Sequence, residues 1–189
     1  MNIQSQIGVT AALPAITMSD DFFEKLMTVV EDTDESDDRM ELLPTMLKRS
    51  LRGLMEFEGL VFDFGKKYSP DSNIGYWLAA KTNQQNSFMM YPSGDKSFHV
   101  VNSDNYSECR VDSRIFGIMM TLMAFSHGSG RYYNVDEKLS ETLAELYHAL
   151  RGAFYNLAES IVYDPESQAS EEEKEQVRAM SSAITSFLD

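Results

Sequence analysis

A hairpin pattern built around the single tryptophan, Trp77, constrains the fold more than any other feature of the chain. Residues 74–81 alternate between two sets of side chains, the period that places one set on a core and the other toward solvent or a covering helix. Polar residues 82–86 make the connection to a second strand, 87–91. Pro92 ends that strand because proline donates no hydrogen bond to a strand ladder. An antiparallel strand pair is therefore expected here.

Two further short strands are expected after the hairpin, at 97–102 and 106–111, with turns rich in Ser, Asp and Asn. Such short spacings favour antiparallel neighbours, because a parallel pairing needs a crossover of about a dozen residues or more. Amphipathic patterns predict helices at 44–68, 113–127 and 136–163. The sequence thus predicts an α+β fold with a central antiparallel β-meander of about four strands packed against several α-helices.

Capping signals mark helix starts near the N-terminus. Ser19 is expected to cap a helix over 20–30, with acidic residues in the first turn where the helix dipole favours them. Pro44 is expected to stand in the first turn of the helix 44–68, where its missing N–H costs nothing.

Similar signals mark the second half of the chain. Asp112 is expected to cap the helix 113–127, whose apolar residues lie nearly all round it, as in a buried central helix. The glycine-containing residues 128–134 predict a loop after this helix. Ser170 and Glu173 form a capping-box pattern that opens a last helix with a narrow apolar seam.

Length and composition predict a single α+β domain over 19–165, between a loose N-terminal leader, 1–18, and a C-terminal acidic helix in 166–189. The leader lacks the basic start of a secretory signal, so it is expected to stay with the protein. The longest apolar run, 115–125, is much shorter than the roughly 20 residues of a membrane span, so no membrane partner is expected. A single Cys109 can form no intramolecular disulfide, which agrees with a cytoplasmic protein.

The net charge of −14 resides mainly at the two ends of the chain. Residues 42–165 carry 14 acids and 12 bases, whereas the other residues carry 16 acids and 4 bases. Binding to phosphates requires clustered Lys and Arg, so direct nucleic-acid binding is not expected. The small basic group Lys48, Arg49 and Arg52 is expected to form surface salt bridges with the acidic loop described next.

An acidic loop is predicted at 31–41. Five of its acids are candidate interaction residues: Asp32, Asp34, Glu35, Asp37 and Asp38. The alternative is a solvated loop without a partner, which is the more usual role of such a run. Calcium binding is not expected, because the run lacks the central glycine and terminal glutamate of a calcium-binding loop.

Residues of the types that carry catalysis are scattered. His99, His127 and His148 fall on different predicted elements, and none has further ligands at metal spacing on its own element. Cys109 fits a half-buried strand thiol better than a nucleophile. No nucleophile elbow or phosphate-binding loop occurs in the sequence, and an acid pair is uninformative in a chain with 30 acids. No catalytic, cofactor or metal site is therefore predicted.

Several segments, in order and spacing, resemble a known family. They are the segment 42–44, an Asn-x-Gly-Tyr-Trp strand, a polar turn, a short strand that ends in proline, the apolar helix that follows, and the segment 146–151. Over 42–163 the chain resembles the antirestriction proteins of the ArdB/KlcA type, which plasmids and phages carry. The positions that carry the signature are Asn73, Gly75, Tyr76, Trp77, Phe88 and Pro92.

The resemblance implies a cytoplasmic mobile-element protein that protects incoming DNA from host Type I restriction, without catalysis and without a cofactor. The implied partner is the host Type I restriction enzyme, affected directly or indirectly. Two other functions stay open on the composition: an acidic DNA-mimic inhibitor whose flanks occupy a DNA-binding cleft, and an acidic binding module like a secretion chaperone. An enzyme is the least expected class.

Overall fold

A computed structural model of the protein describes residues 14–30, 38–70 and 72–189, except for the side chains of 38 and 39. Most of the predicted leader and of the acidic loop lies outside the described residues.

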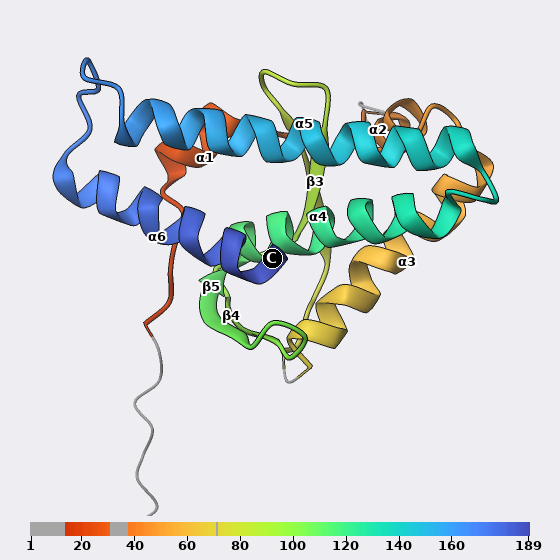
Figure 1. Ribbon diagram of the computed structural model, residues 1–189, viewed down its shortest axis with the longest axis horizontal. Helices are drawn as coiled ribbons and strands as arrows, with labels where there is room; N and C mark the ends of the chain where they lie inside the picture. Colours follow the sequence, from red (N-terminus) through yellow and green to blue (C-terminus); the bar gives the residue numbers. More distant parts are fainter. Residues whose placement is uncertain (1–13, 31–37, 71) are drawn as a thin grey trace, which may run out of the picture.

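A buried helix, α4 (Ser113–Tyr132), lies at the centre of the molecule, as predicted. The Asp112 carboxylate caps it by accepting a hydrogen bond from the Ile115 amide. Two long helices pack against it: α5 (Glu137–Val162), which runs alongside it, and α3 (Leu51–Tyr68). Figure 1 shows α5 above α4, with strand β3 (Phe88–Pro92) passing behind them.

The strands form two antiparallel sheets. The first has the order β1 (Met27–Val30), β2 (Trp77–Thr82) and β3, and the second is the hairpin of β4 (Ser97–Asn102) and β5 (Ser107–Asp112). The predicted α+β class and the antiparallel pairing are confirmed. The four predicted strands do not form one continuous meander, however, because β4 does not pair with β3.

Helix α4 explains why the meander divides. The Thr121 hydroxyl of α4 accepts a hydrogen bond from the Met90 amide of β3 over 3.0 Å. The same hydroxyl donates one to the Met90 carbonyl over 3.2 Å. Backbone groups of a buried strand must find partners. Since a helix side chain supplies them at Met90, β4 is left to pair with β5 on its own.

The first predicted helix is shorter than expected. Ser19 caps α1 (Asp20–Leu26), as predicted, but the helix ends at Leu26 instead of near residue 30. Residues 28–30 are all β-branched, and they pair with residues 79–81 of β2. Strand pairing therefore overrides the helical pattern at these positions.

The predicted helix 44–68 is two helices. The first, α2 (Asp38–Met46), begins inside the predicted acidic loop and contains Pro44 in its interior instead of its first turn. Lys48 and Arg49 then adopt the left-handed conformation, with φ angles of 49° and 57°, which no continuous α-helix allows. Ser50 caps the second helix, α3.

The predicted loop at 128–134 is largely helical, because α4 continues to Tyr132. A Cβ atom on Gly128 would lie 2.8 Å from Leu143 of α5, so this glycine permits close helix packing instead of ending the helix. The last helix, α6 (Glu171–Leu188), begins with the predicted capping box of Ser170 and Glu173. It packs on α4, α5 and β5.

The apolar seam of α6 and the chain before α1 both contact the domain. Four seam residues are buried: Val177, Met180, Ile184 and Phe187. Residues 14–18, assigned to the leader by sequence, lie against the fold: Ile16 forms a bridge with Val111 of β5, and Met18 is buried. Both ends of the described chain thus extend one hydrophobic core.

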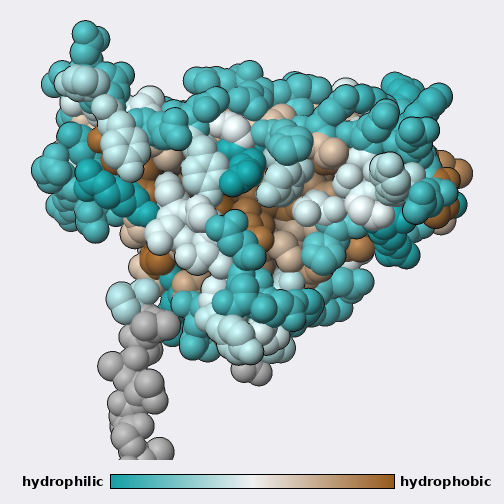
Figure 2. All heavy atoms as spheres, viewed as in Figure 1, coloured by the Kyte–Doolittle hydropathy of each residue, from teal (hydrophilic) through white to brown (hydrophobic). Residues whose placement is uncertain are grey.

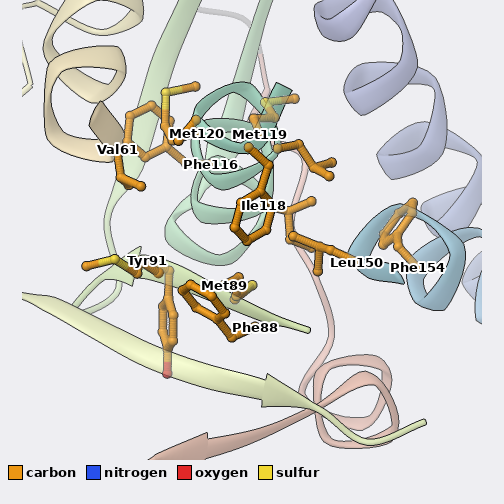
Figure 3. Close-up of a cluster of buried hydrophobic side chains, with 14 of the residues drawn as sticks. Val61, Phe88, Met89, Tyr91, Phe116, Ile118, Met119, Met120, Leu150 and Phe154 are labelled. Carbon is orange, nitrogen blue, oxygen red and sulfur yellow. The ribbon is translucent and has the colours of Figure 1, made fainter. Parts of the chain in front are cut away.

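The core is rich in aromatic and methionine side chains. Figure 3 shows those of α4 facing residues of β3, α3 and α5. The labelled members are Val61, Phe88, Met89, Tyr91, Phe116, Ile118, Met119, Met120, Leu150 and Phe154. Methionine is suited to this place because its flexible side chain fills irregular gaps between rings.

Candidate functional site

The signature positions divide into a buried half and an exposed half. Trp77 is 6% exposed and packs between Phe62 of α3 and Phe116 of α4, with ring centroids 5.5 and 6.1 Å away. Trp77 therefore lies buried where β2 meets two helices. Phe88 is also buried, and Pro92 pairs with Trp77 at the end of the hairpin. These three positions serve the core.

The exposed half, Asn73, Gly75 and Tyr76, lies in the connection between α3 and β2. This connection borders a groove of about 810 Å³ whose other wall is β4; we call it the β4 groove. Its lining residues are Lys67, Ser69, Pro70, Ser72, Asn73, Lys96, Ser97, Phe98, His99, Val101, Ser103 and Arg110. Among the described residues, the lining thus includes four basic side chains and several hydroxyls, with no carboxylate, although the chain has a net charge of −14.

Two of the four basic side chains are paired with acids. The Lys67 ammonium lies 3.3 Å from Asp104 and 3.2 Å from the Tyr68 hydroxyl, and these hydrogen bonds, with Tyr68 first, raise the pKa of Lys67. The His99 ring lies 2.7 Å from Glu108. Neither acid is among the residues that line the β4 groove.

The other two basic side chains contact neutral groups. Lys96 donates to the Asn73 carbonyl over 3.2 Å, and Arg110 donates to the Ser97 hydroxyl over 3.0 Å. No carboxylate of the described residues forms an ion pair with either one. Their charge is therefore available to an anionic group that enters the β4 groove.

A second groove, of about 930 Å³, lies between the first turns of α3 and α5. Three large apolar side chains on it are mostly exposed: Leu51 at 73%, Met55 at 76% and Val135 at 66%. Figure 2 shows apolar side chains at this end of the molecule, where α4 turns into α5. The rim carries equal numbers of acids and bases: Lys48, Arg52, Lys138, Glu56, Asp136 and Glu141.

The sequence-predicted basic group pairs mainly with acids outside the acidic loop. Arg49 lies 3.7 Å from Glu41, the one described contact to that segment, whereas Lys48 lies 2.6 Å from Glu145 of α5. Arg52 lies 3.9 Å from Glu56. Asp32, Asp34, Glu35 and Asp37 fall outside the described residues, and Asp38 begins α2.

Apart from the pair of His99 and Glu108, groups that could carry catalysis lie apart among the described residues. No cluster of three or more His, Cys, Asp or Glu suited to a metal ion occurs among the described residues. Burial first, and the Glu108 charge second, raise the pKa of the Cys109 thiol, which keeps it protonated and weakly nucleophilic. The surface offers binding grooves, and the described part presents no assembled nucleophile and base.

Sequence reasoning missed the basic lining of the β4 groove. Lys67 comes from the end of α3, Lys96 from a turn and Arg110 from β5. These residues are far apart in the sequence and belong to no basic cluster that would predict a shared site. One signal was present: Arg110 and His99 occur on neighbouring predicted strands, which a hairpin brings face to face.

The comparisons with known proteins bear on these surfaces. A family model described as "Antirestriction protein" matches residues 70–166, about half of the chain. The chain belongs to the antirestriction protein family. The match begins at the β4 groove and includes both strand hairpins, α4 and α5.

A structural comparison agrees with this assignment. A solved structure of the KlcA and ArdB proteins is 22% identical in sequence, with a TM-score of 0.59, over 84% of this chain and 94% of that one. Those proteins show a novel fold and antirestriction activity against Type I DNA restriction systems in vivo but not in vitro. No curated protein matches the chain. This antirestriction protein has no helix long and apolar enough to cross a membrane among its described residues.

Proposed function

We propose that this protein protects mobile-element DNA in the cytoplasm by antagonising a host Type I restriction system, and that it does so by binding a partner, without catalysis. The observation that carries the proposal is family membership over residues 70–166. The structural relatives act in vivo but not in vitro, which favours an indirect action through another cellular component. The absence of an assembled catalytic group in the described part is compatible with such a binder.

Imitation of DNA is the competing mechanism, and the described surface gives it less support. A duplex carries about one charge per 1.7 Å of its axis, so a mimic needs an uninterrupted row of carboxylates. Acids at the two ends of the chain are instead partly neutralised: Asp20 lies 2.7 Å from Arg114, and Glu171 lies 3.2 Å from Lys174. The family match also excludes both acidic flanks.

A plating assay tests the proposed function. Expression in a host with a Type I system should raise the plating efficiency of unmodified phage, while methylation of the host DNA stays largely unchanged. A host without the system provides the control and should show no effect. Failure to protect against any of several Type I systems would refute the proposal and favour a general binding module.

A multiple variant separates the two mechanisms. Replacing Asp32, Asp34, Glu35, Asp37 and Asp38 by Asn or Gln should leave protection nearly intact if these acids only solvate the chain. If they imitate phosphates, protection should collapse. Binding of the unaltered protein to the purified restriction enzyme would then weaken steeply with salt, as contacts between many charges do.

A further inference from the structure

The two edges of the β4–β5 sheet have different partners. On the β5 side, the Ile16 amide donates to the Arg110 carbonyl over 2.7 Å, and the Asp112 amide donates to the Ile16 carbonyl over 3.0 Å. The chain itself thus adds a short parallel segment to this edge at Val111. These bonds also show that the Arg110 carbonyl and the Asp112 amide point away from β4.

That direction determines which groups line the opposite edge. Arg110 faces His99 in the register, and Asp112 faces Ser97. Facing residues in an antiparallel pair either bond to each other or both point outward. The backbone N–H and C=O groups of Ser97 and His99, and of Val101 two residues further on, therefore point outward from β4, at intervals of about 6.8 Å.

These outward groups border the β4 groove. The His99 carbonyl accepts a hydrogen bond from the Ser69 hydroxyl over 2.8 Å. Within the described part of the chain, the N–H and C=O groups of Ser97 and Val101 and the N–H of His99 have no hydrogen-bond partner. The side chains of all three residues are exposed, and they line the β4 groove. The edge is thus unpaired on either side of the Ser69 contact, and an unpaired strand edge is a template for a further strand.

The positive charge of the lining favours an acidic peptide strand in the β4 groove. Lys96 and Arg110 form no ion pair with described carboxylates, and Lys96 immediately precedes β4. Three carboxylates, Asp20, Asp95 and Asp112, line a neighbouring pocket that Lys96 and Ser97 also border, whereas the β4 groove itself has none among its lining residues. At physiological salt a charge acts over only about 8 Å, so the lining cations act mainly on a group inside the β4 groove. An extended chain along β4 would place alternate side chains toward this lining.

We propose that the outer edge of β4 is a docking site for an extended, acidic peptide segment of a partner protein, which adds to β4 as a strand and places its carboxylates against Lys96 and Arg110. Main-chain hydrogen bonds would supply affinity, and the basic lining would select the sequence. The site gives the proposed in vivo action a partner surface and rests on that function only for its cellular role.

The backbone chemistry favours a peptide over a nucleic acid. The outward edge alternates donors with acceptors, since Ser97 and Val101 each present a free carbonyl beside their N–H. A peptide strand offers N–H and C=O groups at the same spacing, whereas a phosphodiester backbone offers only acceptors. A chain with a net charge of −14 also repels a polyanion more strongly than a short acidic peptide.

Fluorescence anisotropy with labelled eight-residue peptides tests the proposal. A Glu-Val alternating peptide should bind saturably, at least about tenfold more tightly than a Lys-Val peptide, because the lining is basic. A Glu-Pro alternating peptide should also bind at least about tenfold more weakly, since proline lacks the N–H that pairs with β4. In amide NMR spectra the Glu-Val peptide should shift the signals of Ser97, His99 and Val101.

Matched variants locate the site. Lys96→Glu or Arg110→Gln should weaken binding of the Glu-Val peptide by about tenfold with an unchanged circular dichroism spectrum. Lys138→Glu, on the exposed start of α5, is the control and should bind normally. Absence of saturable binding, equal binding of the Lys-Val peptide, or shifts confined to other residues would overturn the proposal.

Two further arms separate the alternatives. A labelled oligothymidylate that bound more tightly than the Glu-Val peptide, with loss in Lys96→Glu, would replace the peptide by a nucleic acid and overturn the proposal. In the plating assay, Lys96→Glu should reduce protection and Lys138→Glu should not. If the unaltered protein gives no protection at all, the proposed function fails, while the peptide result in vitro still decides the docking site.

Discussion

At the scale of single residues, the close packing of α4 on β3 depends on a glycine and a threonine one helical turn apart. A Cβ atom on Gly117 would lie 2.3 Å from the Tyr91 Cβ atom and 2.6 Å from the Met90 carbonyl oxygen. The Thr121 hydroxyl bonds the Met90 backbone on the same face of α4. This pair lets α4 lie directly on β3, where a larger residue at 117 would separate the two elements.

We therefore expect Gly117→Ala to lower the free energy of unfolding by at least about 1 to 3 kcal/mol, the usual cost of overpacking. Gly130→Ala, also in α4, is the matched control: nothing lies within 4 Å of its Cβ position, so better helix propensity should stabilise the protein by up to about 1 kcal/mol. Urea titration of both variants measures the difference. Equal effects at the two positions would show that α4 can move away from β3.

Trp77 is the largest buried side chain of the signature. Trp77→Ala should cost about 3 to 5 kcal/mol of unfolding free energy, as truncation of a buried aromatic does. Met55→Ala, at a side chain that is 76% exposed, should change it by less than about 0.5 kcal/mol. Intrinsic fluorescence of the native protein provides an independent check, because an emission maximum like that of free tryptophan would contradict burial.

At the scale of elements, polar contacts join helices that are far apart in sequence. The Tyr132 hydroxyl at the end of α4 donates to the Glu56 carboxylate of α3 over 2.5 Å, and Arg131 lies 3.5 Å from the same carboxylate. On the other side of α4, the Asn102 side chain of β4 donates to the Phe187 carbonyl of α6 over 2.9 Å. The first set of contacts joins α3 to α4, and the last joins α6 to β4.

The α3–α4 contact should produce a pH dependence. Burial, and then the hydrogen bond to Glu56, raises the pKa of Tyr132 to about 12, whereas an unfolded tyrosine titrates near 10. The folded state thus binds the proton more tightly, so this contribution to stability is complete below pH 10 and is lost as the pH rises through 12. Unfolding free energies from pH 9 to 12 should fall more steeply for the unaltered protein than for Tyr132→Phe, and parallel curves would contradict the contact.

The packing of α6 on the rest of the domain should contribute to stability. Phe187 is 1% exposed and packs edge-on against Tyr68, with ring centroids 4.9 Å apart. Phe187→Ala should therefore cost about 3 to 5 kcal/mol. Ser182→Ala, on the exposed face of the same helix, should have an effect of less than about 0.5 kcal/mol. Thermal and urea unfolding measure both. A near-neutral Phe187→Ala would mean that α6 is not integral to the domain.

At the scale of the whole molecule, the net charge of −14 opposes compaction. The described ion pairs are mostly on the surface, where each contributes little, so screening of the general repulsion should dominate the response to salt. We expect the urea midpoint to rise between about 0.01 and 0.5 M NaCl. Sucrose at matched osmolality is the control for non-ionic effects. A falling midpoint would show that specific ion pairs outweigh the repulsion.

Elements whose signals are local could be predicted from the amino-acid sequence. Capping side chains at Ser19, Asp112 and Ser170 placed three helix starts, because a cap is made by residues within one turn. The Trp77 hairpin followed from period-two alternation and a proline stop, and its signature also pointed to the correct family. The class of fold and the buried character of α4 followed from hydrophobic patterns alone.

Features that depend on partners distant in the sequence could not be predicted and appeared only in the folded molecule. Residues 28–30 became a strand because β2 was available beside them, and 128–132 stayed helical because α5 packs closely at Gly128. The meander divided because the Thr121 side chain of α4 bonds the Met90 backbone groups of β3. The β4 groove could not be predicted from the sequence for the same reason. Its cations come from separate elements, and only folding brings them together along one strand edge.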